Sequence, residues 1–288
     1  MAAFPAVLRA ARPRQWVKNG LVLAAPLAAG RVGEPDVLAS TALAFVAFCL
    51  AASSVYLVND VRDVQEDQRH PTKRSRAIAA GDLSPTVAVV LAGALVALAL
   101  ALAVRVAIPL AITIVVYLVV QLAYALGLKH QPVLDLAAVA SGFLLRAIAG
   151  GAASDIPLSP WFLLVASFGS LFMVAGKRYS EIHTLGADAG TRRSLEYYSQ
   201  SYLRFVWSMA ASVTVVAYSL WAFRGSTPDS PVSWAEFSVA PFTLAMLRYA
   251  VDIDRGTAGA PEDIAFNDRV LQALGLAWVV TVLLTVYS

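Results

Sequence analysis

The sequence is short of charged residues, of cysteine and of histidine. Asp, Glu, Lys and Arg make up only 14% of the 288 residues, whereas a soluble domain contains about 25%. Cys49 is the single cysteine, which excludes an internal disulfide, and we expect it to be buried as a packing residue. His70, His130 and His183 have no spacing typical of a zinc site. These shortages argue against a soluble protein, a disulfide-stabilised protein and a zinc enzyme.

Long apolar runs are what the sequence has in abundance. Hydrophobic residues make up 59% of the chain, and the mean hydropathy is +0.67. Runs of about 18–22 residues are long enough for a helix to cross the hydrocarbon of a bilayer. Pro109 falls inside the fourth run, where a proline can kink a helix. We therefore predict an all-α, polytopic membrane protein with a single domain over residues 1–288. Its nine spans are expected at about 14–31, 36–58, 85–104, 106–127, 133–152, 159–177, 203–223, 234–252 and 267–287.

The positive charges are distributed unequally between the two sides of the expected membrane. All of the 22 Lys and Arg residues fall in the N-terminal segment or in the loops 2–3, 4–5, 6–7 and 8–9, except Arg31, Arg105, Arg224 and Arg146. Cytoplasmic loops carry the excess of Lys and Arg. The N-terminus and these loops are therefore predicted to lie in the cytoplasm, on the inner face of the plasma membrane.

Arg146 is expected inside the fifth span. Charged residues within a span usually face a polar cavity and mark function, so Arg146 is a candidate substrate-binding residue. A snorkelling side chain or a misplaced span boundary is the alternative interpretation.

A cluster of acidic residues follows the second span. Asp60, Asp63 and Asp67 are spaced i, i+3 and i+7, so on a helix they would share one face, with Asn59 and Glu66 beside them. Carboxylates that lie so close repel one another and lose hydration at the edge of a bilayer. A hard divalent cation removes both penalties, and Mg²⁺ in proteins commonly binds a substrate phosphate as well. The pattern predicts a Mg²⁺–diphosphate site with Asn59 as a further ligand and the three aspartates as catalytic residues.

A cationic loop follows the acidic cluster directly. Its Lys73, Arg74 and Arg76 are suited to binding the oxygens of a diphosphate. The alternative is a solvated charged loop after a helix.

Three further groups of polar residues are expected at the cytoplasmic ends of other spans, and one lies at the N-terminus. For the group around Lys177 and Tyr179, the alternative to substrate binding is a positive-inside anchor with an interfacial tyrosine. For Asp135, which opens the fifth span, the alternative is a favourable position at a helix N-terminus. We expect Trp16 to anchor the N-terminal segment at the membrane surface. The candidate substrate-binding residues are Lys177, Arg178, Tyr179 and Glu181; Arg248, Asp252 and Asp254, suited to sugar hydroxyls; Tyr124 and Lys129; and Lys18 and Asn19.

The pattern Asn59-Asp60-x-x-Asp63-x-x-x-Asp67, the loop Lys73–Arg76 and the number of spans together resemble the UbiA-type intramembrane prenyltransferase superfamily. The resemblance implies a helical bundle open to lipid, a polyprenyl substrate and Mg²⁺-diphosphate bound by acidic motifs on the second and sixth helices. Members with aromatic acceptors carry a second acidic motif, where this chain has Lys177-Arg178-Tyr179-Ser180-Glu181. That difference favours a donor with an additional phosphate.

One branch of the superfamily, the phosphoribosyltransferases, is similar over several segments: residues 12–19, 70–74, 176–179 and 247–254. The resemblance implies transfer of 5-phosphoribosyl from 5-phosphoribosyl-1-diphosphate (PRPP) to decaprenyl or another polyprenyl phosphate, with Mg²⁺ as cofactor, for the synthesis of cell-wall arabinan. The expected partners are these two substrates and the lipid bilayer, with no nucleic acid. The oligomeric state stays open, and a homo-oligomer is one alternative. A prenyltransferase with an aromatic acceptor and a membrane transporter are the alternative functions.

Overall fold

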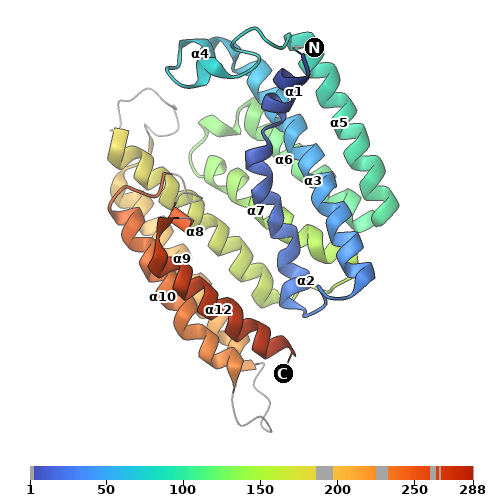
Figure 1. Cartoon of the computed structure of the whole chain (residues 1–288). Coiled ribbons are helices and arrows are strands. Elements are labelled where there is room, and N and C mark those ends of the chain that lie inside the picture. The colour runs from blue at the N-terminus through green and yellow to red at the C-terminus, as the bar shows by residue number, and fades with distance from the viewer. Residues whose placement is uncertain (1–2, 186–196, 225–232, 260–263, 266, 288) are drawn as a thin grey trace. The chain divides into compact units, whose positions relative to one another are not determined.

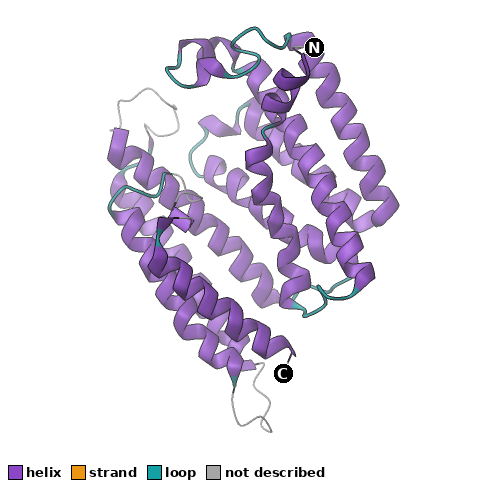
Figure 2. Ribbon diagram, in the orientation of Figure 1, coloured by secondary structure: helices purple, strands orange, loops and turns teal. Residues whose placement is uncertain are grey.

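A computed structural model describes residues 3–185, 197–224, 233–259, 264–265 and 267–287, and within these ranges it contains helices and no strand (Figure 2). The chain divides into two compact units. The first unit comprises Met1–Leu27, Arg31–Gly127 and Leu145–Pro157, and the second comprises Ala28–Gly30, Leu128–Leu144 and Leu158–Ser288. One boundary between the units falls inside a single helix, α7. The expectation of one domain over residues 1–288 stays a prediction.

The first unit is built on the helices α3 and α5, which run side by side in Figure 1. The apolar runs determine the long helices, and the short ones contain or adjoin the polar segments described above. Its elements are α1 (Ala3–Ala11), η1 (Pro13–Leu23), α2 (Ala24–Ala28), α3 (Pro35–Arg62), α4 (Val64–Arg69), η2 (Lys73–Ser75), α5 (Pro85–Val106), α6 (Ile108–Leu126) and residues 145–154 of α7 (Leu134–Ser154).

The second unit is a group of long helices that pack on one another, as Figure 1 shows for the yellow, orange and red ribbons. Phe172, Tyr179, Leu203, Tyr249 and Ile253 form part of its core. Its elements are η3 (Leu128–His130), residues 134–144 of α7, α8 (Pro160–Leu185), α9 (Gln200–Arg224), α10 (Trp234–Asp254) and α12 (Arg269–Tyr287).

Seven of the described helices are long and apolar enough to cross a membrane: α3, α5, α6, α7, α8, α9 and α12. Two of the nine expected spans are not among them. The segment 14–31 is the 3-10 helix η1 followed by the short α2, and α10 carries Glu236 near its start and Asp252 and Asp254 near its end. The expected kink at Pro109 was wrong, because α5 ends before Ala107 and Pro109 lies in the first turn of α6.

Small side chains allow the helices of the first unit to approach closely, as is common between helices in membranes. Ala88, Ala92, Ala99 and Ala103 line the buried face of α5. Large apolar side chains project from its other faces, and Val90 is 69% exposed. Such an apolar surface is suited to contact with lipid rather than water.

The 3-10 helix η1 lies along one face of α3, in the opposite direction. Arg12, next to η1, bonds to Asp60, Trp16 Nε1 donates to Ser53 Oγ at 3.1 Å, and Asn19 Nδ2 donates to Cys49 Sγ at 3.2 Å. A 3-10 helix rises ~2.0 Å per residue and an α-helix ~1.5 Å, so residues 12–19 reach further along α3 than the same residues would in an α-helix. The first expected span is thus a more extended 3-10 helix followed by a short α-helix, rather than one regular α-helix.

The other side of η1 faces α7, where Gly150 permits close contact. A Cβ atom at this position would lie 1.9 Å from the carbonyl oxygen of Val22. Neither backbone can relieve such an overlap without moving, so the sequence needs a glycine here.

We therefore expect Gly150→Ala to destabilise the protein by about 1–3 kcal/mol, as overpacking usually does. Thermal unfolding of detergent-solubilised protein, followed by tryptophan fluorescence, measures the change. Gly93→Ala in α5 is the matched control, because a Cβ atom there would meet nothing within 4 Å. An unfolding temperature of Gly150→Ala equal to that of Gly93→Ala would contradict the close contact between η1 and α7.

Candidate functional site

The acidic cluster lies where α3 ends and α4 begins. The expected continuous helix is interrupted at Asp63, whose backbone (φ −93°, ψ 11°) leaves the helical geometry. Asp60 at the end of α3 and Asp67 in α4 are nevertheless both buried, with 2% and 3% exposure. A short polar side chain such as Asp63 readily ends a helix because it competes for backbone hydrogen bonds.

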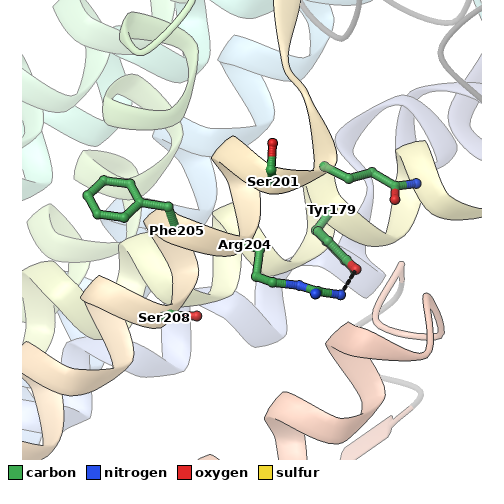
Figure 3. Close-up of a pocket in the computed structure, with 6 residues that line it drawn as sticks. Tyr179, Ser201, Arg204, Phe205 and Ser208 are labelled. Carbon is green, nitrogen blue, oxygen red and sulfur yellow. Dashed lines mark hydrogen bonds between the residues drawn. The ribbon is translucent and has the colours of Figure 1, made fainter.

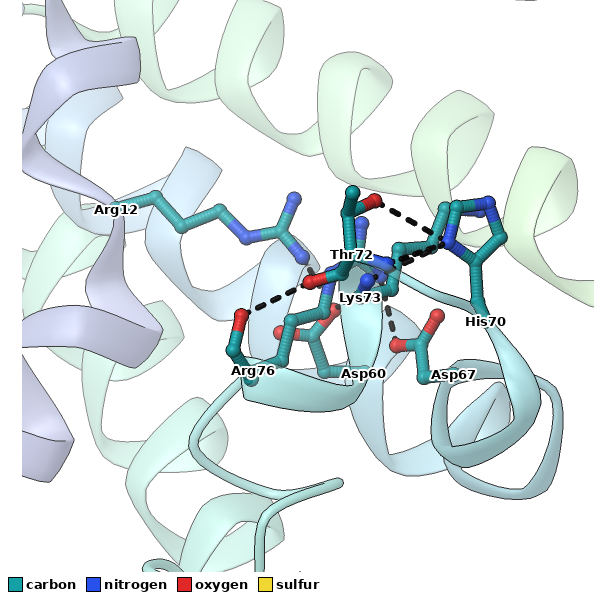
Figure 4. Close-up of polar contacts among 8 residues, drawn as sticks. Arg12, Asp60, Asp67, His70, Thr72, Lys73 and Arg76 are labelled. Carbon is teal, nitrogen blue, oxygen red and sulfur yellow. Dashed lines mark hydrogen bonds and ion pairs between the residues drawn. The ribbon is translucent and has the colours of Figure 1, made fainter.

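Two arginines neutralise the buried carboxylates (Figure 4). Arg76 Nη1 donates to Asp67 Oδ2 at 2.7 Å and to Asp60 Oδ1 at 3.1 Å. Arg12 donates to the same oxygen of Asp60 and lies 5.0 Å from the centre of the Tyr56 ring. Arg76 was expected at this site, whereas Arg12 was not assigned a role. Its φ of +54°, which is rare for a residue other than glycine, marks Arg12 as constrained.

His70 shapes the cationic loop that follows. Its Nδ1 atom accepts hydrogen bonds from the backbone N–H groups of Thr72 and Lys73, at 3.3 and 3.4 Å (Figure 4). These bonds form the turn that starts the short 3-10 helix Lys73–Ser75. Lys73 is partly buried in this turn, and Arg74 is exposed. The sequence offered no signal for this role of His70, because its partners are backbone groups.

The donor groups of this centre fit a hard divalent cation, which prefers carboxylate and amide oxygens. The Oδ1 atom of Asn59 is buried, and none of the described residues hydrogen-bonds to it. Within the described ranges, however, no three His, Cys, Asp or Glu side chains are arranged to hold a metal ion. In this arrangement the guanidinium of Arg76 bridges the two buried carboxylates.

Arg146 lies in the part of α7 that belongs to the first unit and is buried, with 6% exposure. Its Nε donates to Asn19 Oδ1 at 2.7 Å and its Nη2 to Tyr117 OH at 3.1 Å. Its guanidinium also lies over the Tyr117 ring, 4.9 Å from the ring centre. The snorkelling alternative is wrong, because the charged group is enclosed by side chains from η1 and α6. Cys49, which accepts from Asn19, is buried as expected.

In the second unit, Arg178 lies between two carboxylates. Its Nε is 3.4 Å from Asp135 Oδ2, and its Nη1 donates to Glu181 Oε2 at 2.9 Å. Asp135 is fully buried and Arg178 is 3% exposed. Asp135 opens α7, as expected, but it is also the buried partner of Arg178, which the sequence spacing did not indicate.

Tyr198, in the segment before α9, completes this buried cluster. Its hydroxyl donates to Asp135 Oδ1 and accepts from the backbone N–H of Val133 at 2.6 Å. Val133 has a φ of +67°, a strained conformation for a β-branched residue. Burial, and then the hydrogen bond to Asp135, raise the pKa of the Tyr198 hydroxyl above its ordinary value of 10.0. The phenol therefore stays protonated, as its role as a donor requires.

Arg204 connects three helices of the second unit, α8, α9 and α10. Arg204 of α9 donates through Nη2 to Tyr179 OH and to Asp254 Oδ1 of α10, both at 2.8 Å. Near Tyr179 in α8, Gly176 allows α10 to approach, because a Cβ atom there would lie 2.4 Å from Ile253 Cδ1. Arg204 was not among the expected site residues.

The remaining candidates have varied surroundings. Arg248 Nε donates to Asp268 Oδ2 at 2.6 Å, and Asp268 also accepts from the N–H groups at the start of α12. The hydrogen bond from the N–H of Leu271, together with the one from Arg248, lowers the pKa of Asp268. Asp252 Oδ2 is buried, and no described residue hydrogen-bonds to it. Lys18, Tyr124, Lys129 and Lys177 are partly buried.

The expected site residues are thus divided between the two units. The structure brings together subsets of them, notably Asp60, Asp67 and Arg76 in the first unit and Tyr179 and Asp254 in the second. The first unit contains Lys18, Asn19, Asn59, Asp60, Asp63, Asp67, Lys73, Arg74, Arg76, Tyr124 and Arg146, and the second contains Lys129, Lys177, Arg178, Tyr179, Glu181, Arg248, Asp252 and Asp254.

A comparison with protein families matches residues 20–267 to the UbiA prenyltransferase family. This chain belongs to the UbiA prenyltransferase family. The UbiA fold is also seen in a solved structure of a UbiA homolog from Archaeoglobus fulgidus bound to GPP and Mg²⁺. It is 14% identical, with a TM-score of 0.73, and the match covers 98% of this chain and all of that one. The resemblance inferred from the sequence is confirmed, and the chain is an integral membrane protein.

Two closer relatives of this UbiA protein carry the same name. Decaprenyl-phosphate phosphoribosyltransferase of Mycolicibacterium smegmatis is 55% identical, over 98% of this chain and 92% of its own length. The protein of that name from Mycobacterium tuberculosis is 56% identical, over 96% of this chain and 92% of its own. The similarity covers both units.

We expect Tyr198→Phe to lower the free energy of unfolding by about 1–3 kcal/mol near neutral pH, because it removes a buried donor to Asp135 and an acceptor from Val133. The difference in the free energy of unfolding between wild type and Tyr198→Phe should become smaller above about pH 10. There the unfolded wild type loses the phenolic proton that the folded wild type retains, so its stability falls as the pH rises. Chemical unfolding at neutral pH and at about pH 11 measures both effects.

Tyr202→Phe is the control for this substitution, since the Tyr202 ring stacks on Tyr198 at the same end of α9 and is partly exposed. A Tyr198→Phe protein as stable as Tyr202→Phe at neutral pH would contradict the role of the hydroxyl.

Proposed function

We propose that this protein is a decaprenyl-phosphate phosphoribosyltransferase, which transfers 5-phosphoribosyl from PRPP to decaprenyl or another polyprenyl phosphate. The products are decaprenylphosphoryl-5-phosphoribose and diphosphate. The observation that carries the proposal is the identity of 55–56% over nearly the whole chain to relatives of that name. The basic segment Lys177-Arg178 supports a phosphorylated sugar donor rather than a donor held between two acidic motifs.

We assign Asn59, Asp60, Asp63 and Asp67 to binding Mg²⁺ on the diphosphate of PRPP. Bound there, Mg²⁺ would neutralise negative charge that develops on the leaving diphosphate. Lys73, Arg74 and Arg76 follow within the same part of the first unit, and their cationic groups suit the diphosphate oxygens. The contacts of Arg76 Nη1 with both Asp60 and Asp67 support this assignment, because both carboxylates lie within reach of one cationic group.

The chemistry needs little beyond alignment and charge stabilisation. The bond between C1 of the ribose and the diphosphate oxygen breaks, and the electron pair leaves with diphosphate. A phosphate oxygen of the polyprenyl phosphate forms the new bond to C1 from the opposite face. That nucleophile is already an anion, so no general base is required. The protein would accelerate the step by positioning the two substrates and stabilising the leaving group.

The other candidate residues are assigned to substrate binding. We propose that Lys177, Arg178 and Tyr179 bind the second phosphate, and that Asp252 and Asp254 contact ribose hydroxyls. The Oδ2 atom of Asp252 is buried, and no described residue hydrogen-bonds to it. This supports the proposed contact with a ribose hydroxyl, which would provide the hydrogen bond. The remaining residues assigned to substrates are Lys18, Asn19, Tyr124, Lys129, Arg146, Glu181 and Arg248.

We place the active site on the cytoplasmic side of the plasma membrane. The excess of Lys and Arg in the N-terminal segment and in four loops supports this orientation. PRPP is a cytosolic metabolite, so it would reach the site from that side, while the lipid substrate enters from the bilayer. A homo-oligomer is compatible with this arrangement.

Purified protein should transfer radiolabel from PRPP to decaprenyl phosphate, and the transfer should require Mg²⁺. Label extracted into organic solvent measures the product. No label with PRPP, but transfer with a polyprenyl diphosphate and an aromatic acceptor, would overturn the proposal. Removal of divalent ions with a chelator should abolish transfer, and added Mg²⁺ should restore it, because the carboxylates would then lack their cation.

Asp63→Asn and Asp67→Asn should each lower kcat at least about 100-fold if an electrostatic interaction of ~2.7 kcal/mol with the leaving group is lost. Asp36→Asn is the matched control, because Asp36 is an exposed carboxylate at the opposite end of α3. Size-exclusion chromatography establishes that each variant is folded. A folded variant with wild-type turnover would remove that aspartate from the metal site.

A further inference from the structure

The second unit contains a hollow whose wall includes an arginine without a role in the proposed reaction so far. The hollow has a volume of about 410 Å³, within the range of pockets that bind small molecules, about 300–1,000 Å³. It lies beside the first turns of α9 and the end of α8 (Figure 3). The residues that line it are Tyr179, Gln200, Ser201, Arg204, Phe205 and Ser208.

The charge of Arg204 is far more accessible than that of Arg178. The side chain of Arg178 is 4% exposed, and Asp135 and Glu181 both offset its charge. The side chain of Arg204 is 57% exposed, and its one carboxylate partner among the described residues is Asp254, which is exposed to the same extent. Exposed ion pairs contribute little to stability, so a phosphate dianion can replace Asp254 as the partner of Arg204.

The other groups around the hollow are suited to phosphate oxygens. Ser201 and Ser208 carry hydroxyl donors and Gln200 an amide donor, and they lie with Arg204 on one face of α9. Arg204 Nη2 already bonds to the Tyr179 hydroxyl, which orients the guanidinium, as the dashed line in Figure 3 shows. Phe205 contributes an apolar ring to the wall, so the polar groups are set in a partly apolar lining.

We infer that this hollow binds a phosphate monoester, with Arg204 as the principal cation and Tyr179 as its support. The inference rests on the proposed transfer reaction, because both substrates carry such a group: the 5-phosphate of PRPP and the phosphate of the polyprenyl lipid. Arg178, assigned above to the same phosphate, also holds α8 to the start of α7 through its ion pair with Asp135.

Steady-state kinetics of Arg204→Gln with each substrate varied in turn test the inference. Loss of a charge-assisted hydrogen bond should raise KM by about tenfold or more, and Arg204→Lys should recover part of the loss because it restores the charge. Arg224→Gln is the matched control, since Arg224 lies at the opposite end of α9, over the Trp161 ring. A rise in KM for PRPP identifies the 5-phosphate as the ligand, and a rise for the lipid identifies the lipid phosphate.

The inference is overturned if Arg204→Gln changes neither KM by more than Arg224→Gln does. Calorimetry with ribose 5-phosphate and with a short-chain polyprenyl phosphate provides a measurement that needs no turnover. Wild type and Arg224→Gln should bind one of these probes, and Arg204→Gln should bind it at least about tenfold more weakly. If wild-type protein binds a probe but transfers no label, the proposed function is refuted and the phosphate site is supported. If wild-type protein binds neither probe, the phosphate site is refuted.

Discussion

The structure of the first unit depends on the need to neutralise carboxylates buried at the end of an apolar helix. Asp60 and Asp67 are almost fully buried, and a buried charge without a partner is strongly destabilising. Arg12 and Arg76 meet this need from opposite directions in the chain. The bond from Arg12 fixes the start of η1 against α3, and Trp16 and Asn19 continue the contact. The other side of η1 then meets α7 at Arg146 and Gly150.

The second unit also contains a buried carboxylate whose charge is neutralised by other side chains. Asp135 is fully buried, and Arg178 from α8 and Tyr198 from the segment before α9 contact its two oxygens. Tyr198 also holds Val133 in a strained conformation through its backbone N–H. Buried ion pairs are weak sources of stability, because desolvation offsets most of the attraction. We interpret the role of both clusters as holding cationic and acidic groups in fixed positions at the ends of helices. An enzyme that acts on phosphorylated substrates would need groups fixed in this way.

The sequence predicted some parts of this arrangement well and missed others. The apolar runs located eight of the long helices, although α8 continues well beyond its expected end at residue 177, to Leu185. The burial of Cys49 and the enclosed position of Arg146 are confirmed. The UbiA family and its phosphoribosyltransferase branch were also recognised from short motifs, and the relatives confirm them. Arg12, Tyr198 and Arg204 were missed as members of polar clusters, and Asp135 was expected near Tyr124 and Lys129 rather than next to Arg178. Each bonds to a residue far away in the chain, so no local spacing could reveal the pairing.

The sequence by itself determined which segments are helical and which residue types could bind Mg²⁺ and phosphate, and it predicts a cytoplasmic side for most of the cations. It did so because hydropathy and charge are properties of short stretches of chain. Only the tertiary structure decided which cation meets which carboxylate, that residues 13–23 form a 3-10 helix, and that Arg178 is enclosed while Arg204 is accessible. Those outcomes depend on helix packing, since a side chain's partners and exposure are set by neighbours that the chain brings together only on folding.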